Sequence, residues 1–87
     1  MMFTVKWTQR ALNQLADFYV AMDLPGQDRL GAKIDALNRR LSRDPMDEGE
    51  SRAGNYRVTF VEDLTIRFTV DPDDRVVRVY AVHRRGQ

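Results

Sequence analysis

The residues best suited to chemistry are a group of arginines in the second half of the chain and the only histidine, His83. The arginines lie in segments where polar and apolar residues alternate, namely Arg57, Arg67, Arg78 and Arg84. A guanidinium group can bind two oxygens of one phosphate, and histidine is the side-chain type that exchanges protons near neutral pH. This combination favours chemistry on a phosphodiester.

Cleavage of RNA requires a base for the 2′-hydroxyl proton, a cation for the pentavalent phosphate and an acid for the leaving oxygen. Arg67 lies at the centre of the middle alternating segment and is the expected phosphate-binding residue. His83, Glu48 and Glu50 are the candidates for proton transfer. The expected nucleic-acid contacts are Arg57, Arg78 and Arg84, with Tyr80 as an aromatic residue on which a base can stack.

A plainer interpretation remains open for each of these residues. The arginines can form a solvated surface that pairs with the nearby carboxylates Glu62, Asp63, Asp71 and Asp73. Glu48 and Glu50 can each be a solvated loop residue. Strict alternation places His83 on the apolar side of its segment and Arg84 on the basic side, which counts against a catalytic role for His83.

The alternation itself predicts three antiparallel strands, near residues 56–60, 64–70 and 76–84, joined by turns at Glu62-Asp63 and Pro72–Asp74. One face is expected to be apolar and to need a cover, with Val58, Phe60, Ile66, Phe68, Val77 and Val79. The other face is expected to carry Arg57, Arg67, Arg78, Arg84 and Tyr80.

The first half of the chain predicts that cover. Residues 3–7 alternate as a strand, and Thr8 is a suitable N-cap for a helix. The segment 23–26 interrupts the helical pattern, and a second helix is expected from about Gln27 to Arg43, before Asp44-Pro45. The predicted class is α+β, with the order strand, helix, helix and three strands, and a helical hairpin on one face of an antiparallel sheet.

Length and composition set further limits. The chain has 87 residues with 14 Lys and Arg, 13 Asp and Glu and no cysteine, which predicts one domain over 1–87. A disulfide or cysteine–metal site is excluded, and neither a metal site nor a cofactor is expected. No apolar run approaches the ~20 residues of a membrane span, and no signal peptide is evident. We therefore expect a cytoplasmic protein without a membrane partner.

Several short segments, in this order, resemble the RelE/ParE family of bacterial type II toxins. They are FTVKW with Ala11 and Leu15, the Asp-Pro that closes the second helix, GESR, YRV, IRFTVD and the closing RVYAVHRR. The resemblance implies the fold predicted above. It also implies a toxin that is neutralised by a cognate antitoxin protein.

In the RelE branch, the resemblance implies metal-independent, ribosome-dependent cleavage of mRNA. Arg67 matches the arginine that contacts the scissile phosphate, His83, Arg84 and Arg85 match a histidine–arginine element, and Glu50 resembles the glutamate that some members use as base. The chain lacks the paired lysines and the C-terminal tyrosine of many RelE-like nucleases. The alternatives are a ParE-like poison of DNA gyrase and a divergent antitoxin-binding member without nuclease activity.

Overall fold

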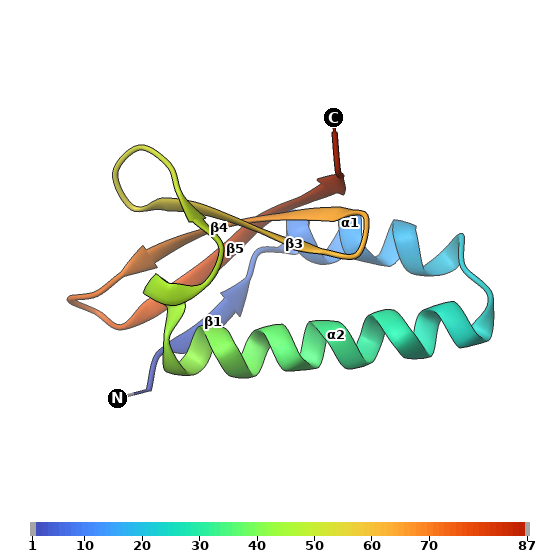
Figure 1. The fold of residues 1–87 in the computed structure, drawn as a ribbon, viewed down its shortest axis with the longest axis horizontal. Helices are drawn as coiled ribbons and strands as arrows, with labels where there is room; N and C mark the ends of the chain where they lie inside the picture. Colours follow the sequence, from blue (N-terminus) through green and yellow to red (C-terminus); the bar gives the residue numbers. More distant parts are fainter. Residues whose placement is uncertain (1, 87) are drawn as a thin grey trace.

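The computed structural model describes residues 2–86 and begins with a short strand that leads directly into a helix (Figure 1). Strand β1 spans Thr4–Trp7 and helix α1 spans Gln9–Val20. The Thr8 hydroxyl oxygen accepts a hydrogen bond from the Ala11 N–H at 3.1 Å. This satisfies one of the free N–H groups of the first turn and confirms the predicted N-cap.

Helix α2 spans Leu24–Arg43 and begins three residues earlier than the sequence pattern suggested. The Asp23 carboxylate accepts from the Gly26 N–H at 2.9 Å, and Pro25 lies in the first turn. Proline is tolerated there because that N–H has no helical partner anyway. The segment that ends α1 therefore also starts α2, and the two helices run antiparallel (Figure 1). Within residues 2–86, no helix is long and apolar enough to cross a membrane.

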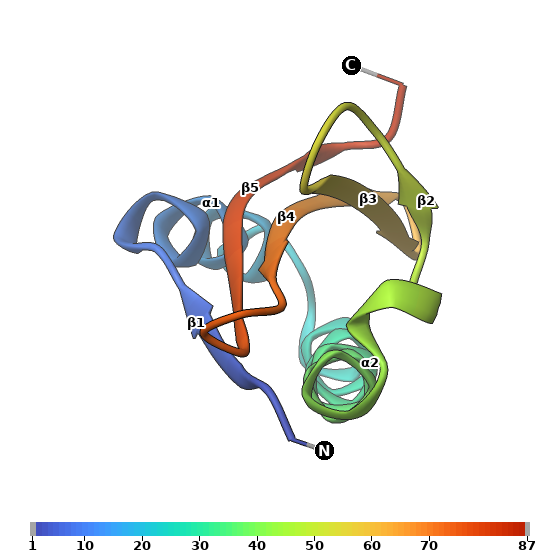
Figure 2. The same ribbon diagram turned by 90° about the vertical axis from the view of Figure 1, so that its left-hand side faces the viewer.

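A 3₁₀ turn at Pro45–Asp47 leads to four further strands, β2 (Glu50–Ser51), β3 (Tyr56–Val61), β4 (Leu64–Asp71) and β5 (Val76–Arg84). Their order in the sheet is β1-β5-β4-β3-β2 (Figure 2). The predicted antiparallel arrangement of β3, β4 and β5 is confirmed. The sheet as a whole is mixed rather than antiparallel, because β1 pairs in parallel with β5. The α+β class is confirmed, with β2 as an additional short strand.

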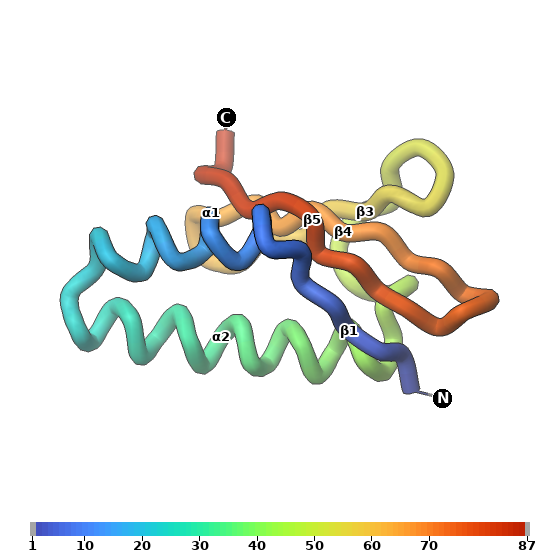
Figure 3. Tube along the Cα trace, turned by 180° about the vertical axis from the view of Figure 1, so that it is seen from behind, coloured from blue at the N-terminus to red at the C-terminus, as the bar shows by residue number. Residues whose placement is uncertain are grey.

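The core lies between the helices and one face of the sheet. The large buried side chains of α2 recur at helical spacing, at Leu30, Ile34, Leu37 and Leu41, and α1 adds Ala11 and Leu15. They pack with the strand residues Val61, Leu64, Ile66, Phe68, Val70, Val77, Val79 and Val82. The end of α2 lies beside β1 (Figure 3), where the Phe3 N–H donates to the Ser42 carbonyl oxygen at 2.7 Å. The helical hairpin therefore covers one face only and leaves the other accessible.

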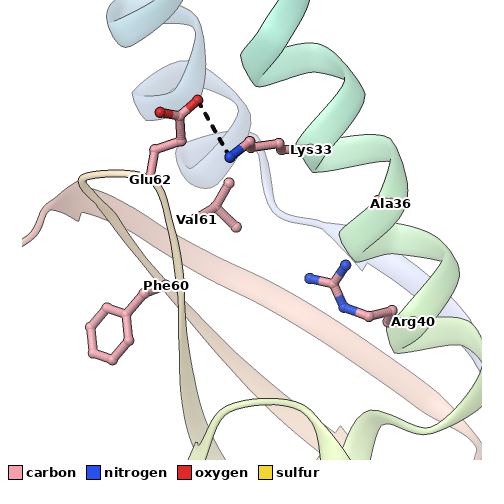
Figure 4. A pocket seen from close by; sticks show the side chains of 6 residues that line it. All are labelled: Lys33, Ala36, Arg40, Phe60, Val61 and Glu62. Carbon is pink, nitrogen blue, oxygen red and sulfur yellow. Dashed lines mark ion pairs between the residues drawn. The ribbon is translucent and has the colours of Figure 1, made fainter.

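Strand β3 faces the opposite way from the prediction. The turn at Glu62-Asp63 pairs Val61 with Leu64, so Val61 and the alternate residues Thr59 and Arg57 share the face of the core. Figure 4 shows Val61 directed toward α2 and Phe60 directed away from it. Arg57 is therefore not on the basic face, and Val58 and Phe60 are not part of the apolar face that the helices cover.

The end of strand β5 is also inverted relative to the prediction. The register shifts between Arg67 and Phe68 of β4, which face Ala81 and Val79 of β5, so Tyr80 is an extra residue. Such a β-bulge reverses the alternation of every later residue. His83, expected on the helix side, lies on the accessible face opposite Thr65, whereas Arg84 lies on the helix side.

We use the term open face for the side of the sheet that the helices leave uncovered. It is formed by Glu50 of β2, Tyr56, Val58 and Phe60 of β3, Thr65, Arg67 and Thr69 of β4, and Arg78, Ala81 and His83 of β5. The ring of Tyr80, from the bulge, lies against Tyr56 on this face.

Candidate active site

The centre of the candidate site is a hydrogen bond between two of the residues that the sequence singled out. The Arg67 Nε–H donates to His83 Nε2 at 3.0 Å. The other ring nitrogen of His83, Nδ1, lies 3.2 Å from the Arg84 carbonyl oxygen. Because Nε2 accepts a hydrogen bond from Arg67, the tautomer with its hydrogen on Nδ1 fits both contacts, and Nδ1–H then donates to that carbonyl. His83 is therefore oriented through both ring nitrogens.

Glu50 lies on the same face, on the opposite side of Arg67 from His83. It pairs with Val58 of β3, which in turn pairs with Arg67 of β4. Two strand spacings separate the Glu50 and Arg67 backbones, or about 10 Å. The Glu50 carboxylate is 63% exposed and pairs with Arg52 at 3.2 Å. The structure thus brings Glu50, Arg67 and His83 to one face, with Arg67 in the middle.

The other predicted nucleic-acid contacts divide between the two faces. Arg78 is exposed on the open face. Arg84 pairs with Asp63 at 3.1 Å, and its guanidinium lies 5.6 Å from the centre of the Phe18 ring of α1. Arg57 donates to the main-chain carbonyl of Glu48 at 3.2 Å. Arg57 and Arg84 therefore have structural contacts away from the open face.

Two aromatic residues of this face, Tyr56 and Phe60, were not among the predicted site residues. Tyr56 and Tyr80 meet edge to face with ring centres 5.8 Å apart. The Arg85 guanidinium lies 4.2 Å from the centre of the Phe60 ring. The sequence contained the information needed to place Tyr56 and Phe60 on this face. A two-residue turn at Glu62-Asp63 pairs Val61 with Leu64, and this pairing fixes which residues of β3 share a face.

The carboxylates expected to neutralise the arginines mostly have other partners. Glu62 pairs with Arg29 of α2 at 2.8 Å, and Asp71 accepts from the backbone N–H groups of Asp73 and Asp74 in the turn. Among residues 2–86, neither Arg67 nor Arg78 forms an ion pair with a carboxylate. The interpretation of a fully paired surface therefore holds for Arg84 alone, through Asp63.

Glu48 holds the segment before β2 in place. Its carboxylate accepts from Arg40 Nε at 2.8 Å and from the Thr59 hydroxyl at 2.7 Å. Burial alone raises the pKa of Glu48, but the hydrogen bonds from Arg40 and Thr59 and the charges of Arg40 and Arg57 outweigh it and lower the pKa below 4.5. This network fastens the connection to α2 and β3, and so positions β2 and Glu50.

A groove of about 280 Å³ lies between α2 and β3, lined by Lys33, Ala36, Arg40, Phe60, Val61 and Glu62 (Figure 4). Lys33 and Glu62 form an ion pair of 4.0 Å at one end of it. The groove does not include Arg67, His83 or Glu50, so it is separate from the candidate site. Among the described residues, no three His, Asp or Glu side chains gather closely enough to hold a metal ion.

The chain matches the model of a toxin family over residues 5–87, with the description ParE toxin of the type II toxin–antitoxin system, parDE. Because this match covers almost the whole sequence, the chain belongs to that family, within the wider RelE/ParE group of type II toxins. The family predicted from the sequence is thereby confirmed. No sequence among curated proteins matches significantly.

Solved structures of both branches share the fold. A chain of the RelBE2 toxin–antitoxin complex from Mycobacterium tuberculosis has a TM-score of 0.68 and 16% identity, covering 100% of this chain and 95% of that one. A chain of the chromosomal ParDE system from P. aeruginosa has a TM-score of 0.68 and 23% identity, covering 97% of each chain. E. coli RelE with a RelB peptide has a TM-score of 0.66 and 16% identity, covering 100% of this chain and 86% of that one. These similarities establish the fold and do not distinguish the branches.

Proposed function

We propose that this toxin is a metal-independent endoribonuclease that cleaves mRNA on the ribosome. The observation that carries the proposal is the Arg67–His83 hydrogen bond on the open face. It joins a permanent cation to a proton-exchanging group on the middle strands of the sheet, where the backbone is fixed on both sides. The resemblance to the RelE branch, in which these two positions match functional residues, supports the same chemistry.

In the proposed reaction a base removes the proton of a 2′-hydroxyl group, and that oxygen attacks the adjacent phosphorus. The bond from phosphorus to the 5′-oxygen breaks, and an acid gives that oxygen a proton. The products are a 2′,3′-cyclic phosphate and a 5′-hydroxyl end. The attacking and leaving oxygens lie on opposite sides of the phosphorus in such an in-line displacement.

The register of the strands suits this geometry. Arg67 lies between Glu50 on one side and His83 on the other. With the phosphate on Arg67, Glu50 is the base and His83 is the acid. The Glu50–Arg52 pair is exposed, and such pairs contribute only about 0–1 kcal/mol, so Glu50 can exchange Arg52 for a substrate proton at little cost.

Substrate binding also prepares His83 for its role. A phosphate oxygen is a stronger acceptor for the Arg67 guanidinium than a neutral imidazole nitrogen. When the phosphate replaces His83 as the partner of Arg67, the Nε2 lone pair becomes free to take up a proton. His83 can then donate a proton to the leaving oxygen, as the acid must.

The test is cleavage of mRNA on programmed ribosomes in the presence of a chelator. Arg67→Ala is expected to reduce cleavage by about 10²–10³-fold, as expected for the loss of one charge-stabilising donor. His83→Ala and Glu50→Gln are expected to reduce it by about 10²–10⁴-fold. Arg39→Ala, which removes an exposed arginine of α2, is the matched control. Full cleavage by folded Arg67→Ala protein would refute the assigned site.

We further propose that the partner of this toxin is a cognate antitoxin protein. The support is the family description, which names a toxin–antitoxin system, and the fold shared with chains of the RelBE2 and ParDE systems. Co-expression of the chain with the product of a small adjacent gene should give a complex that purifies as one species and lacks toxicity. Toxicity that no adjacent gene product suppresses would contradict the pairing.

A second candidate function is inhibition of DNA gyrase without nuclease chemistry. The specific observation in its favour is that the matched family model describes ParE toxins. Inhibition of gyrase supercoiling by the purified protein, together with intact mRNA on programmed ribosomes, would select this function. In that case Arg67→Ala and His83→Ala should have similar effects to other surface substitutions.

A further inference from the structure

The open face carries aromatic side chains on both sides of Arg67. Tyr56 and Phe60 lie on β3, each two residues from Val58, which pairs with Arg67. Tyr56 is 52% exposed and Phe60 is 38% exposed. Large aromatic side chains are usually much more buried, and exposed ones on one face commonly mark a binding surface.

Each aromatic residue is held by a second side chain. Tyr56 meets the ring of Tyr80 edge to face across β4, an arrangement favoured by the ring quadrupoles. Arg85 lies over the Phe60 ring, where a cation–π contact orients the guanidinium. The face therefore has two preformed pairs that each contain an aromatic ring, with Arg67 between them. We call Tyr56–Tyr80 and Phe60–Arg85 the two aromatic pairs.

The spacing of these pairs suits two nucleotides. A strand advances about 3.3 Å per residue, so Tyr56 and Phe60 each lie about 7 Å along β3 from the position opposite Arg67. The two aromatic side chains are therefore about 13 Å apart along β3, a separation that the bases on either side of one phosphate reach when they are turned away from each other. A phosphate at Arg67 would therefore place the bases of its two neighbouring nucleotides at the two aromatic pairs.

We propose that the open face binds the two nucleotides on either side of the phosphate at Arg67 by stacking one base on each aromatic pair. This inference rests on the proposed function, because it takes that phosphate to be the one that is cleaved. The RNA must be single-stranded, since paired bases do not expose their ring faces. Little sequence preference is expected from stacking, because every base has a ring face.

The direction of the bound RNA follows from the residues that lie in line with His83 across the sheet. Phe60 pairs with Thr65, and Thr65 pairs with His83. If His83 protonates the leaving 5′-oxygen, the nucleotide on the 3′ side of the phosphate lies over Phe60, Thr65 and His83, with its base on the Phe60–Arg85 pair. The nucleotide that supplies the 2′-hydroxyl then has its base on Tyr56–Tyr80.

The experiment uses a dinucleotide with a single phosphate, a 2′-deoxy sugar on the 5′ side and the fluorescent base 2-aminopurine at either position. Stacking quenches this fluorophore, and one phosphate allows one register. Both probes are expected to be quenched by the native protein. Tyr80→Leu should mainly relieve the quenching of the 5′ probe, Phe60→Leu should mainly relieve that of the 3′ probe, and each should weaken binding by at least about fivefold.

The controls and outcomes separate this inference from the nuclease proposal. Val20→Ala, which alters an exposed apolar residue of α1, should leave both titrations unchanged, and thermal melting checks the fold of each variant. Quenching that neither Tyr80→Leu nor Phe60→Leu alters, or no binding at millimolar dinucleotide, would overturn the inference even if the toxin cleaves mRNA. Probe-specific loss of quenching would support the inference even if no cleavage is found on ribosomes.

Discussion

Glu48 joins three parts of the molecule, and its replacement by glutamine tests whether that network stabilises the fold. The carboxylate binds Arg40 of α2 and Thr59 of β3, and the Glu48 carbonyl accepts from Arg57. The Glu48 side chain is only 14% exposed. Glu48→Gln preserves the shape of the side chain and removes its charge.

The expected magnitude follows from these two hydrogen bonds. A hydrogen bond to a charged group contributes about 1.5–3 kcal/mol and a neutral one about 0.5–1.5 kcal/mol. The Arg40 side chain is 52% exposed, so its share is reduced by solvent screening. We expect Glu48→Gln to lower the free energy of unfolding by about 1–2 kcal/mol at pH 7. For a domain of this size, each 1 kcal/mol corresponds to a decrease in Tm of roughly 4–8 °C.

The loss must depend on pH in a defined direction. The pKa of Glu48 is lowered in the folded state, so the ionised carboxylate stabilises the fold above its ordinary pKa of 4.5. That stabilisation disappears as pH falls through the lower folded-state pKa. The difference in Tm between native protein and Glu48→Gln should therefore be largest near neutral pH and should vanish in strong acid.

The assay is thermal unfolding followed by circular dichroism between pH 3 and pH 7.5. Glu50→Gln, in the same connection but with a 63% exposed carboxylate, is the matched control and should change Tm very little. An equal Tm for native protein and Glu48→Gln at pH 7 would refute the structural role of this carboxylate. A difference that persists unchanged in strong acid would show that shape, and not charge, is responsible.

Three further substitutions test the fold and the site. Gly49 has a φ of 66°, and a Cβ there would collide with the Val58 carbonyl oxygen. Gly54 has a similar φ of 62° but open space around it. In chemical denaturation, Gly49→Ala should therefore lower the free energy of unfolding by more than the ~1 kcal/mol expected for Gly54→Ala. Ile66 is 0% exposed, so Ile66→Asp should abolish the dispersed amide spectrum of the folded state, and an unchanged spectrum would mean that the faces of β4 are inverted. Arg67→Ala should cost less than ~1 kcal/mol in the same denaturation assay because the residue is only partly buried and has no ion-pair partner among the described residues. A large loss would make Arg67 a structural residue.

The elements that the sequence predicted correctly are those that local chemistry determines. The helical stripe ending in Leu41 needed only the period of the apolar residues, and Thr8 needed only its position before the first turn. The start of α2 was missed because Pro25 was interpreted as a helix breaker, although it occupies the first turn, where proline fits. The parallel pairing of β1 with β5 depends on contacts across the whole chain, which no local pattern contains.

The faces of the strands illustrate the same division within the candidate site. The face of Arg57 could have been predicted. The turn after Val61 pairs Val61 with buried Leu64, and Arg57, four residues earlier, lies on the same face as Val61. The bulge at Tyr80 could not have been predicted, because Val79, Ala81 and Val82 are all apolar and permit either register. The pattern of a single strand therefore cannot assign the faces of a strand that contains a bulge.

The bulge also explains why the site has its composition. Under strict alternation the register of Val77 and Val79 would continue, so that Tyr80 would lie opposite Arg67 and Val82 opposite Thr65 on the open face, and His83 would point toward the helices. The residue opposite Thr65 would then be apolar, and no histidine would lie beside Arg67 to transfer a proton. With the extra residue, His83 accepts a hydrogen bond from Arg67, while Arg84 pairs with Asp63 and contacts Phe18. A bulge beside a functional site commonly redirects a side chain in this way, and here it places beside Arg67 the histidine that the proposed reaction needs.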